Sequence, residues 1–187
     1  MKGDKKFMAI CTLKAHVSRA LAFYNLDSIW FSIGKSSRWT ADDIDDFDAN
    51  IDYDKYPPVP KNTDEMKEII GFKRVEFKAM VVQDDAGTLD YRNVKWRVVD
   101  PENAVREGAR WVYVATGLSY NELPVENPYR QIGVHTGLKP VEGVLSTLYS
   151  LLPNQVSDEG LLEVIDNRKP VYRDMDVRER IKLILEF

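Results

Sequence analysis

Apolar and polar residues alternate along much of the chain, and this pattern predicts a fold made mainly of β-strands. The strand candidates are rich in Val, Ile and aromatic residues, which favour the pleated surface of a sheet, and turn-like sequences such as DDAG and DPEN separate several of them. The candidates are residues 7–13, 28–34, 72–83, 94–100, 110–117 and 129–138. Because the last four follow one another with short connections, we expect an antiparallel sheet or sandwich.

The last residues of the chain show the clearest alternation. Every second position from residue 181 is apolar, namely Ile181, Leu183, Leu185 and Phe187. Successive side chains of a strand point to opposite faces, so these four side chains share one face. We therefore expect a C-terminal strand whose apolar face lies in the core.

Helical periodicity is confined to two or three short segments. The first segment predicts an amphipathic helix over residues 13–24, with one stripe formed by Leu13, His16, Val17, Ala20, Leu21 and Tyr24. Thr63 or Asp64 is placed to cap a second helix, which Gly71 would end. Residues 142–152 fit either a short helix or an irregular apolar turn. The predicted fold class is therefore α+β and β-dominated, with two or three short helices.

Residues 36–61 lack any regular pattern and predict one long acidic and proline-rich loop. Seven aspartates lie between Asp42 and Asp54, and YPPVP follows at residues 56–60. Proline lacks a backbone N–H and favours extended geometry in the residue before it, so we expect the end of this loop to be an extended surface connector. The chain is long enough to bury a sizeable core, and we expect residues 1–187 to form a single compact domain.

Composition narrows the range of partners and compartments. Against 30 Asp and Glu residues there are 26 Lys and Arg, a net charge of −4, so the chain has no overall positive field for nucleic acid or an anionic membrane. Cys11 is the single cysteine and cannot form an internal disulfide, which fits a reducing compartment. The apolar stretch at residues 7–13 is too short for a signal peptide or a membrane helix. We therefore expect a soluble protein made in the cytoplasm.

Two motifs point to phosphate or calcium, and neither is complete. GKSS at residues 34–37 resembles the end of a phosphate-binding loop, but Ile29 stands where that loop needs a glycine. The aspartate run offers oxygen ligands, yet read as an EF-hand from Asp46 it has Ile51 and Pro57 where glycine and glutamate are required. The run therefore predicts a solvated loop or a docking surface for a basic neighbour, with a calcium-stabilised module as a further hypothesis.

Few residues are available for a transition metal or for nucleophilic catalysis. The chain has only His16, His135 and Cys11 as nitrogen and sulfur ligands, whereas a structural zinc site needs four. His16 lies on the apolar stripe of its helix and is interpreted as a core or boundary histidine. Since no nucleophile elbow is found either, we predict no catalytic residue, no cofactor and no metal site.

The aromatic residues separate into two groups. Trp96, Trp111 and Phe77 lie within strand patterns, so we expect them in the core. Trp39 follows the glycine turn and precedes the acidic loop. This position favours a loop anchor or a place in an interface.

Seven stretches together carry a family resemblance, namely ALAFYNLDSIWFSIGKSSRW, YPPVP, IIGFKRV, VKWRVV, WVYVATG, YRQIGVHTGLKP and the ending DNRKPVYRDMDVRERIKLILEF. In this order along the chain, they resemble the baseplate wedge proteins of contractile-tailed, T-even-like bacteriophages. The resemblance runs from about Ala20 to Phe187 and is to the small wedge subunit that forms dimers. This chain departs from that subunit by a shorter middle part, around residues 84–129, and by Arg38 where a proline commonly precedes the tryptophan.

The resemblance implies a compact structural protein of the tail baseplate, located in the virion and assembled in the host cytoplasm. It implies a homodimer that contacts other baseplate wedge proteins, without catalysis or a cofactor. The alternative is a tail-associated carbohydrate-binding or hydrolytic module, which requires a concave pocket with carboxylates or a row of exposed rings. For Arg168, an ion pair across an interface and a role in fixing the turn before the last strand both remain open. The candidate interface or motif residues are Gly34, Trp39, Pro57, Pro58, Arg130, Asn167, Arg168 and Pro170.

Overall fold

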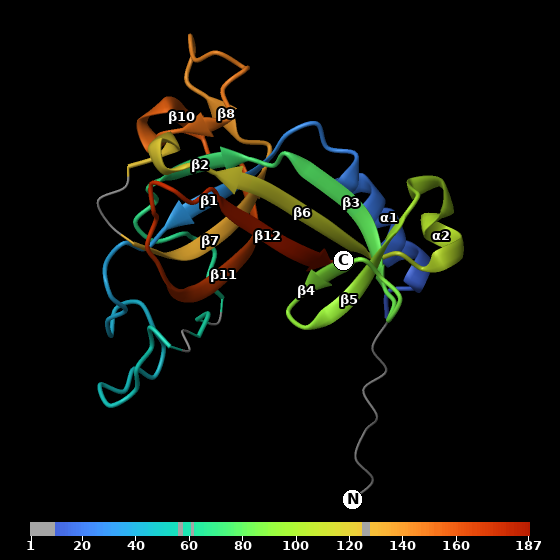
Figure 1. Ribbon diagram of the computed structural model, residues 1–187, viewed down its shortest axis with the longest axis horizontal. Helices are drawn as coiled ribbons and strands as arrows, with labels where there is room; N and C mark the ends of the chain where they lie inside the picture. Colours follow the sequence, from blue (N-terminus) through green and yellow to red (C-terminus); the bar gives the residue numbers. More distant parts are fainter. Residues whose placement is uncertain (1–9, 56–57, 61, 125–127) are drawn as a thin grey trace, which may run out of the picture. The chain divides into compact units, whose positions relative to one another are not determined.

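The computed structural model describes residues 10–55, 58–60, 62–124 and 128–187, which form a β-dominated α+β fold (Figure 1). Antiparallel sheets and few short helices confirm the predicted fold class. The chain divides into two compact units. Unit 1 contains the chain up to Asn25, Lys78–Val114 and Leu183–Phe187, and unit 2 contains Leu26–Phe77 and Ala115–Lys182. The organisation of residues 1–187 as a single domain stays a prediction.

Unit 1 is built from two helices and a five-stranded sheet with the order β12-β6-β3-β5-β4, of which β3, β6 and β12 also have residues in unit 2. The bounds are α1 Leu13–Tyr24, β3 Phe77–Gln83, β4 Leu89–Tyr91, β5 Val94–Val99, α2 Ala104–Glu107, β6 Trp111–Leu118 and β12 Glu179–Glu186. A 3₁₀ turn, Pro101–Asn103, precedes α2. Alternate residues of β12 are buried, which confirms the predicted C-terminal core strand; they are Ile181, Leu183 and Leu185.

Unit 2 is built around a five-stranded sheet with the order β11-β7-β1-β2-β9 and a two-stranded sheet of β10 and β8. The bounds are β1 Ile29–Gly34, β2 Gly71–Arg74, β7 Tyr129–Thr136, β8 Lys139–Pro140, β9 Ser150–Leu151, β10 Val156–Asp158 and β11 Leu161–Val171. Every residue of β1 and of β7 is buried, and Phe31 and Ile33 lie opposite Val134 and Ile132. Buried strands at the centre of the sheet give unit 2 a rigid base from which its loops leave.

The N-terminal helix was predicted with its observed bounds, but the described residues before it do not form the strand that was predicted there. Residues 7–9 lie outside the described residues, and residues 10–12 are exposed and form no strand. Thr12 instead caps α1, since its side chain accepts a hydrogen bond from the Ala15 N–H at 3.3 Å. A threonine N-cap satisfies one of the free amide groups at the start of a helix, so Thr12 marks the beginning of α1 and not the end of a strand.

The helix expected from residue 63 to Gly71 is wrong. This segment is irregular, and Gly71 begins β2. Its backbone groups bond to other parts of unit 2: the Ile70 N–H donates to the Ile33 carbonyl at 2.7 Å, and the Lys67 carbonyl accepts from the Lys35 N–H at 2.8 Å. Glu68 has a φ of 46°, which a right-handed helix cannot contain. Hydrogen bonds to β1 therefore replace those of a helix.

Two further segments, residues 72–83 and strand β11, differ from prediction, whereas residues 142–152 follow the irregular-turn alternative. Residues 72–83 form two strands, β2 and β3, separated at residues 75 and 76. Residues 142–152 form turns and the short strand β9. The strand β11 was not expected at all, so residues 167–170 lie within a strand and not in a turn.

The aromatic predictions for the core hold for Trp96 but fail for Phe77. Trp96 is buried and packs edge-to-face on Trp111, which is half-buried, with a ring separation of 5.7 Å. Phe77 is 47% exposed. It is the first residue of β3, where a side chain at the end of a strand has few neighbours on its face.

Candidate functional site

The loop over residues 36–60 is a folded segment with a small core of its own. Its described residues form turns, without a helix or strand. Trp39, Ile44 and Tyr53 are buried together, and the Phe47 ring stacks on the Tyr53 ring at 5.0 Å. The loop therefore has a defined shape, while five of its seven aspartates remain exposed, namely Asp42, Asp45, Asp46, Asp48 and Asp52.

Lys35 fixes the start of this loop, directly after β1 ends at Gly34. Its side chain is 3% exposed, and its Nζ lies 2.8 Å from Asp43 Oδ2 and 2.9 Å from Glu68 Oε1. Nζ also donates to Ser37 Oγ at 2.8 Å. Burial alone would lower the pKa of Lys35, but the hydrogen bonds to both carboxylates outweigh burial and raise this pKa. The lysine therefore stays charged and joins three segments of the chain.

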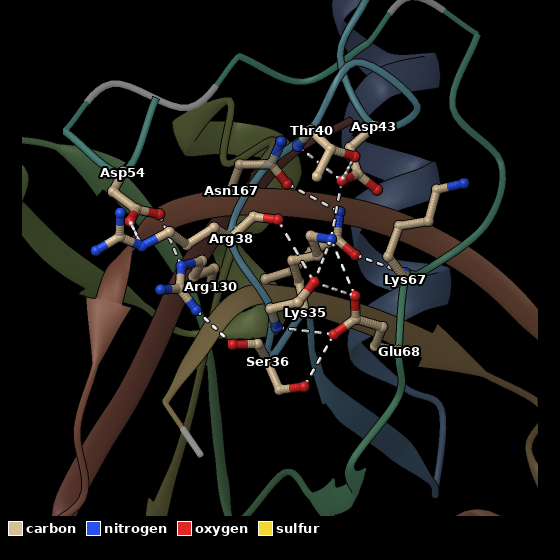
Figure 2. Close-up of polar contacts among 12 residues, drawn as sticks. Lys35, Ser36, Arg38, Thr40, Asp43, Asp54, Lys67, Glu68, Arg130 and Asn167 are labelled. Carbon is tan, nitrogen blue, oxygen red and sulfur yellow. Dashed lines mark hydrogen bonds and ion pairs between the residues drawn. The ribbon is translucent and has the colours of Figure 1, made fainter. Parts of the chain in front are cut away.

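Glu68 is the acceptor at the centre of the site (Figure 2). Its Oε2 accepts from Ser36 Oγ at 2.9 Å and from the Ser37 N–H at 2.8 Å, and its Oε1 accepts from Lys35 Nζ and Ser37 Oγ. Partial burial opposes ionisation, but these donors outweigh it and lower the pKa of Glu68 to about 2. Glu68 has a left-handed backbone conformation, and its carboxylate bonds to the first residues of the loop.

Acid should weaken the protein through Glu68 in a defined pH range. The pKa of this carboxyl falls from 4.5 to about 2 on folding, so its stabilisation is complete above pH 4.5 and is lost as the pH falls towards 2. We expect Glu68→Gln to be less stable than the wild-type protein at pH 6, with a difference that shrinks below pH 4.5. Urea unfolding from pH 6 to pH 2.5 measures this. Glu102→Gln, at an exposed position, is the control and should follow the wild-type curve; a constant difference for Glu68→Gln would contradict the assignment.

Arg130 holds the far end of the loop from the central strand β7. The residue is 4% exposed, its Nε lies 2.7 Å from Asp54 Oδ1, and its Nη1 donates to the Ser36 carbonyl at 2.5 Å. The exposed Arg38 lies 3.9 Å from the other oxygen of Asp54. One buried guanidinium thus joins the beginning and the end of the loop.

A chain of amide hydrogen bonds completes the site (Figure 2). The Lys67 N–H donates to Gln131 Oε1 at 2.7 Å, and Gln131 Nε2 donates to Asn167 Oδ1 at 2.9 Å. Asn167 Nδ2 in turn donates to the Pro58 carbonyl. Strands β7 and β11 therefore position the proline segment of the loop through side-chain amides.

Five of the predicted interface or motif residues meet in or beside this network, namely Gly34, Trp39, Pro58, Arg130 and Asn167. Arg168 and Pro170 lie farther along β11, and Arg168 Nη2 pairs with Asp166 Oδ2 at 2.7 Å in the same strand. Pro57 lies outside the described residues. An interface role for any of these residues stays a prediction.

Sequence reasoning did not find the charged residues at the centre of the site. Lys35 was noticed only as part of an incomplete phosphate motif, and Glu68 was assigned to a helix that does not form. Asp43 and Asp54 were not distinguished from the other aspartates of the run. No local pattern identifies these pairs, because Lys35 and Glu68 are 33 positions apart and Asp54 and Arg130 are 76 apart.

Metal ligands do not gather in the part of the chain that the structure describes. Among the described residues, no group of three or more His, Cys, Asp or Glu is placed to hold a metal ion. Cys11 is exposed, His16 is half-buried in α1, and His135 is buried in β7. None of the described helices has the length and apolar character needed to cross a membrane.

The buried charges of this site are paired within the chain, and they hold a surface loop in a defined shape. Such an arrangement gives the loop a defined surface that is available for contacts. Residues 8–187 match the family described as baseplate wedge 3 tail fiber network component, and the chain belongs to this family. It is therefore a structural component of a phage virion, in the baseplate wedge and tail fibre network.

A relative supports the same assignment. The chain is 32% identical over 186 residues to a protein named "Virion protein 3" from Enterococcus phage phiEF24C. The matched region covers 95% of this chain and 94% of the relative, so the similarity extends over both proteins almost completely.

Proposed function

We propose that the protein acts as a homodimer in the baseplate of a contractile tail, where it contacts neighbouring wedge proteins and catalyses no reaction. In this proposal the chain is made and assembled in the host cytoplasm and then remains in the virion. The observation that carries the proposal is an exposed apolar stretch in unit 2, residues 141–152, which we call the apolar loop. A protein that works through contacts needs such a surface.

The apolar loop follows β8 and includes the short strand β9, in the orange part of the ribbon in Figure 1. It exposes five large apolar side chains, each between 37% and 68% accessible: Val141, Leu145, Leu148, Tyr149 and Leu152. Scattered apolar residues are normal on a protein surface, but five within twelve positions are typical of a contact site. Glu142 is the single charged residue of this stretch.

The composition of the apolar loop favours a second copy of the same chain as its occupant. In a two-fold dimer, the same patch of each subunit meets its copy, so the patch must be complementary to itself. Apolar surface meets this condition, because burying it against itself is favourable and creates no repulsion between like charges. The acidic loop over residues 36–60 is not complementary to itself, because two copies would repel each other. This loop therefore suits an unlike, basic neighbour.

Leu145→Asp tests the dimer. Leu145 is 68% exposed, so the substitution should leave the fold intact while placing a charge in the contact. We expect the wild-type protein to sediment as a dimer at micromolar concentration and the variant to sediment as a monomer, with dimer dissociation at least tenfold easier. Met175→Asp, at a site that is 76% exposed in unit 2, is the matched control and should remain a dimer.

A monomeric wild-type protein, or a Leu145→Asp variant that still forms dimers, would contradict the dimer contact. Location is tested separately by antibody-gold electron microscopy of purified particles. Label at the end of a contractile tail supports the baseplate proposal. Label on a non-contractile tail would contradict the proposal that the tail is contractile.

A further inference from the structure

Two hollows in unit 2 share residues 63–65 in their linings. The larger has a volume of about 530 Å³ and the smaller of about 210 Å³. The larger falls within the range of about 300–1,000 Å³ that is usual for ligand pockets. Its lining combines apolar side chains with carboxylates, including Met66, Ile69, Leu162, Asp64, Glu65 and Glu159.

The apolar side of the larger hollow rests on β7 and β11. Gly133 in β7 leaves room there, because a Cβ at this position would lie 2.9 Å from Leu162 Cδ1 and 3.0 Å from Met66 Sδ. Leu162 and Met66 can therefore pack close to the sheet beside the half-buried Ile69. The result is a hollow with an apolar wall of defined shape.

His135 supports this wall in its neutral form. Its Nδ1 lies 3.1 Å from the Glu159 carbonyl oxygen, and its Nε2 lies 2.8 Å from Ser32 Oγ. A carbonyl oxygen only accepts, so Nδ1 carries the proton and donates, while Nε2 accepts from the serine. Burial lowers the pKa of His135, so the ring brings no positive charge to the hollow at neutral pH.

The described lining of the larger hollow carries negative charge. None of its carboxylates, on Asp64, Glu65 and Glu159, forms an ion pair with a described residue, and no lysine or arginine is among its described lining residues. Partial burial and the nearby charge of Glu65 raise the pKa of Glu159. These carboxylates repel one another, so the hollow is suited to receive a cation.

We propose that the larger hollow binds a lysine or arginine side chain from a basic segment of a neighbouring virion protein. The proposal deepens the assembly role given above and rests on it, since it names the chemistry of an unlike partner. Lysine and arginine carry an apolar stem and a charged end, which match the apolar wall and the carboxylate rim. Asp42 lines the smaller hollow, whose lining also includes Lys67, and adds an exposed carboxylate to this surface.

Other ligands fit the hollow less well. A hard metal ion requires several oxygen ligands directed at one point, and no such group is found among the described residues. A sugar ring is commonly held against an aromatic side chain, but no Trp, Tyr or Phe is among the described lining residues of the larger hollow. A basic side chain uses both features that are present, the carboxylates and the apolar wall.

Fluorescence anisotropy with the full chain tests the proposal. The probe is a fluorescein-labelled peptide of alternating lysine and serine, and a peptide of alternating glutamate and serine is its control. We expect the lysine peptide to bind and the glutamate peptide not to bind, with weaker binding as salt rises, because the ion pairs lie near the surface. The double variant Glu65→Gln/Glu159→Gln should weaken binding of the lysine peptide about tenfold.

The matched control is Asp27→Asn/Asp176→Asn, which removes the same amount of charge from exposed positions that line neither hollow. It should bind as the wild-type protein does. Equal losses in both double variants would show general attraction by net charge and would overturn the proposal, as would the absence of lysine-peptide binding. A rise in melting temperature with oligosaccharides, but not with the lysine peptide, would assign the hollow to glycans instead.

Binding of the lysine peptide should not depend on whether the protein forms a dimer. Leu145→Asp should bind the lysine peptide as well as the wild-type protein does, because Leu145 lines neither hollow. Loss of the dimer with retained peptide binding supports both proposals. A dimer in which the Glu65→Gln/Glu159→Gln variant binds the lysine peptide normally would overturn only the assignment of the hollow.

Discussion

Replacing Lys35 with methionine is expected to destabilise the protein by about 3 kcal/mol. The substitution keeps most of the apolar stem and removes the charge that Asp43 and Glu68 share. Breaking a buried ion pair usually costs about 3–5 kcal/mol, because the remaining charge has lost its partner. The lower end applies here, since the Glu68 side chain is 38% exposed and water can replace part of the interaction.

Urea unfolding at pH 7 measures this loss, with Lys67→Met as the matched control. Lys67 is exposed, and its side chain points away from the cluster in Figure 2, so the same chemical change should alter stability by less than about 0.5 kcal/mol. Adding Glu68→Gln to Lys35→Met should recover part of the stability, because it removes one uncompensated charge. Equal losses for Lys35→Met and Lys67→Met would show that the buried lysine is not the anchor of the loop.

The strands that could be predicted from the sequence are those with one strong apolar pattern. Ile181, Leu183 and Leu185 recur at every second position, and β1 and β7 are rich in β-branched and aromatic residues. Burial enforces such patterns, so they remain visible without the structure. The helix α1 was visible for the same reason, with a period of 3.6 residues.

Strand β11 could not be predicted because it lies at the edge of its sheet. It pairs only with β7 in the sheet order, and it contains Asp166, Asn167, Arg168, Lys169 and Pro170, which a central strand would not tolerate together. Edge strands accept proline and charged residues, since one side of their backbone has no partner strand. These residue types are typical of a turn, so the sequence predicted a turn where the strand forms.

The segment before β2 was misread for a different reason. Thr63, Asp64, Glu65 and Ile69 follow a helical start pattern, which is a local property. The competing interactions are hydrogen bonds to Ile33, Lys35 and Gln131, and these partners become available only after the sheet has formed. Tertiary hydrogen bonds thus outweigh a weak helical preference.

Resemblance to known wedge proteins, together with the position of Trp39 before the acidic run, pointed to the region of the candidate site. The matched stretches pointed to Gly34, Arg130 and Asn167, and the structure places all three in or beside the polar network. The chemistry at its centre could not be inferred, because ion pairs between distant segments leave no periodic trace in a single sequence. Family resemblance and the position of Trp39 therefore located the region, and only the fold revealed its pairs of charges.

Gly34→Ala should destabilise the protein by about 3 kcal/mol, although it changes no charge. A Cβ on Gly34 would lie 2.4 Å from the Lys67 carbonyl oxygen, 3.3 Å from the Glu68 carbonyl oxygen and 3.4 Å from Ile69 Cα. All three obstacles are backbone atoms, which cannot rotate away as a side chain does. The segment over residues 67–69 must therefore move, and the hydrogen bond from the Lys35 N–H to the Lys67 carbonyl is lost.

Thermal and urea unfolding of Gly34→Ala measure the loss, and Gly137→Ala is the control. At Gly137 a Cβ would meet nothing within 4 Å, but φ is 73°, so the substitution should cost only about 1 kcal/mol of backbone strain. A loss at Gly34 no larger than at Gly137 would mean that residues 67–69 yield easily. Glu68 would then lie on a mobile support, and the rigid attachment of the acidic loop would have to come from Arg130 and Asn167 alone.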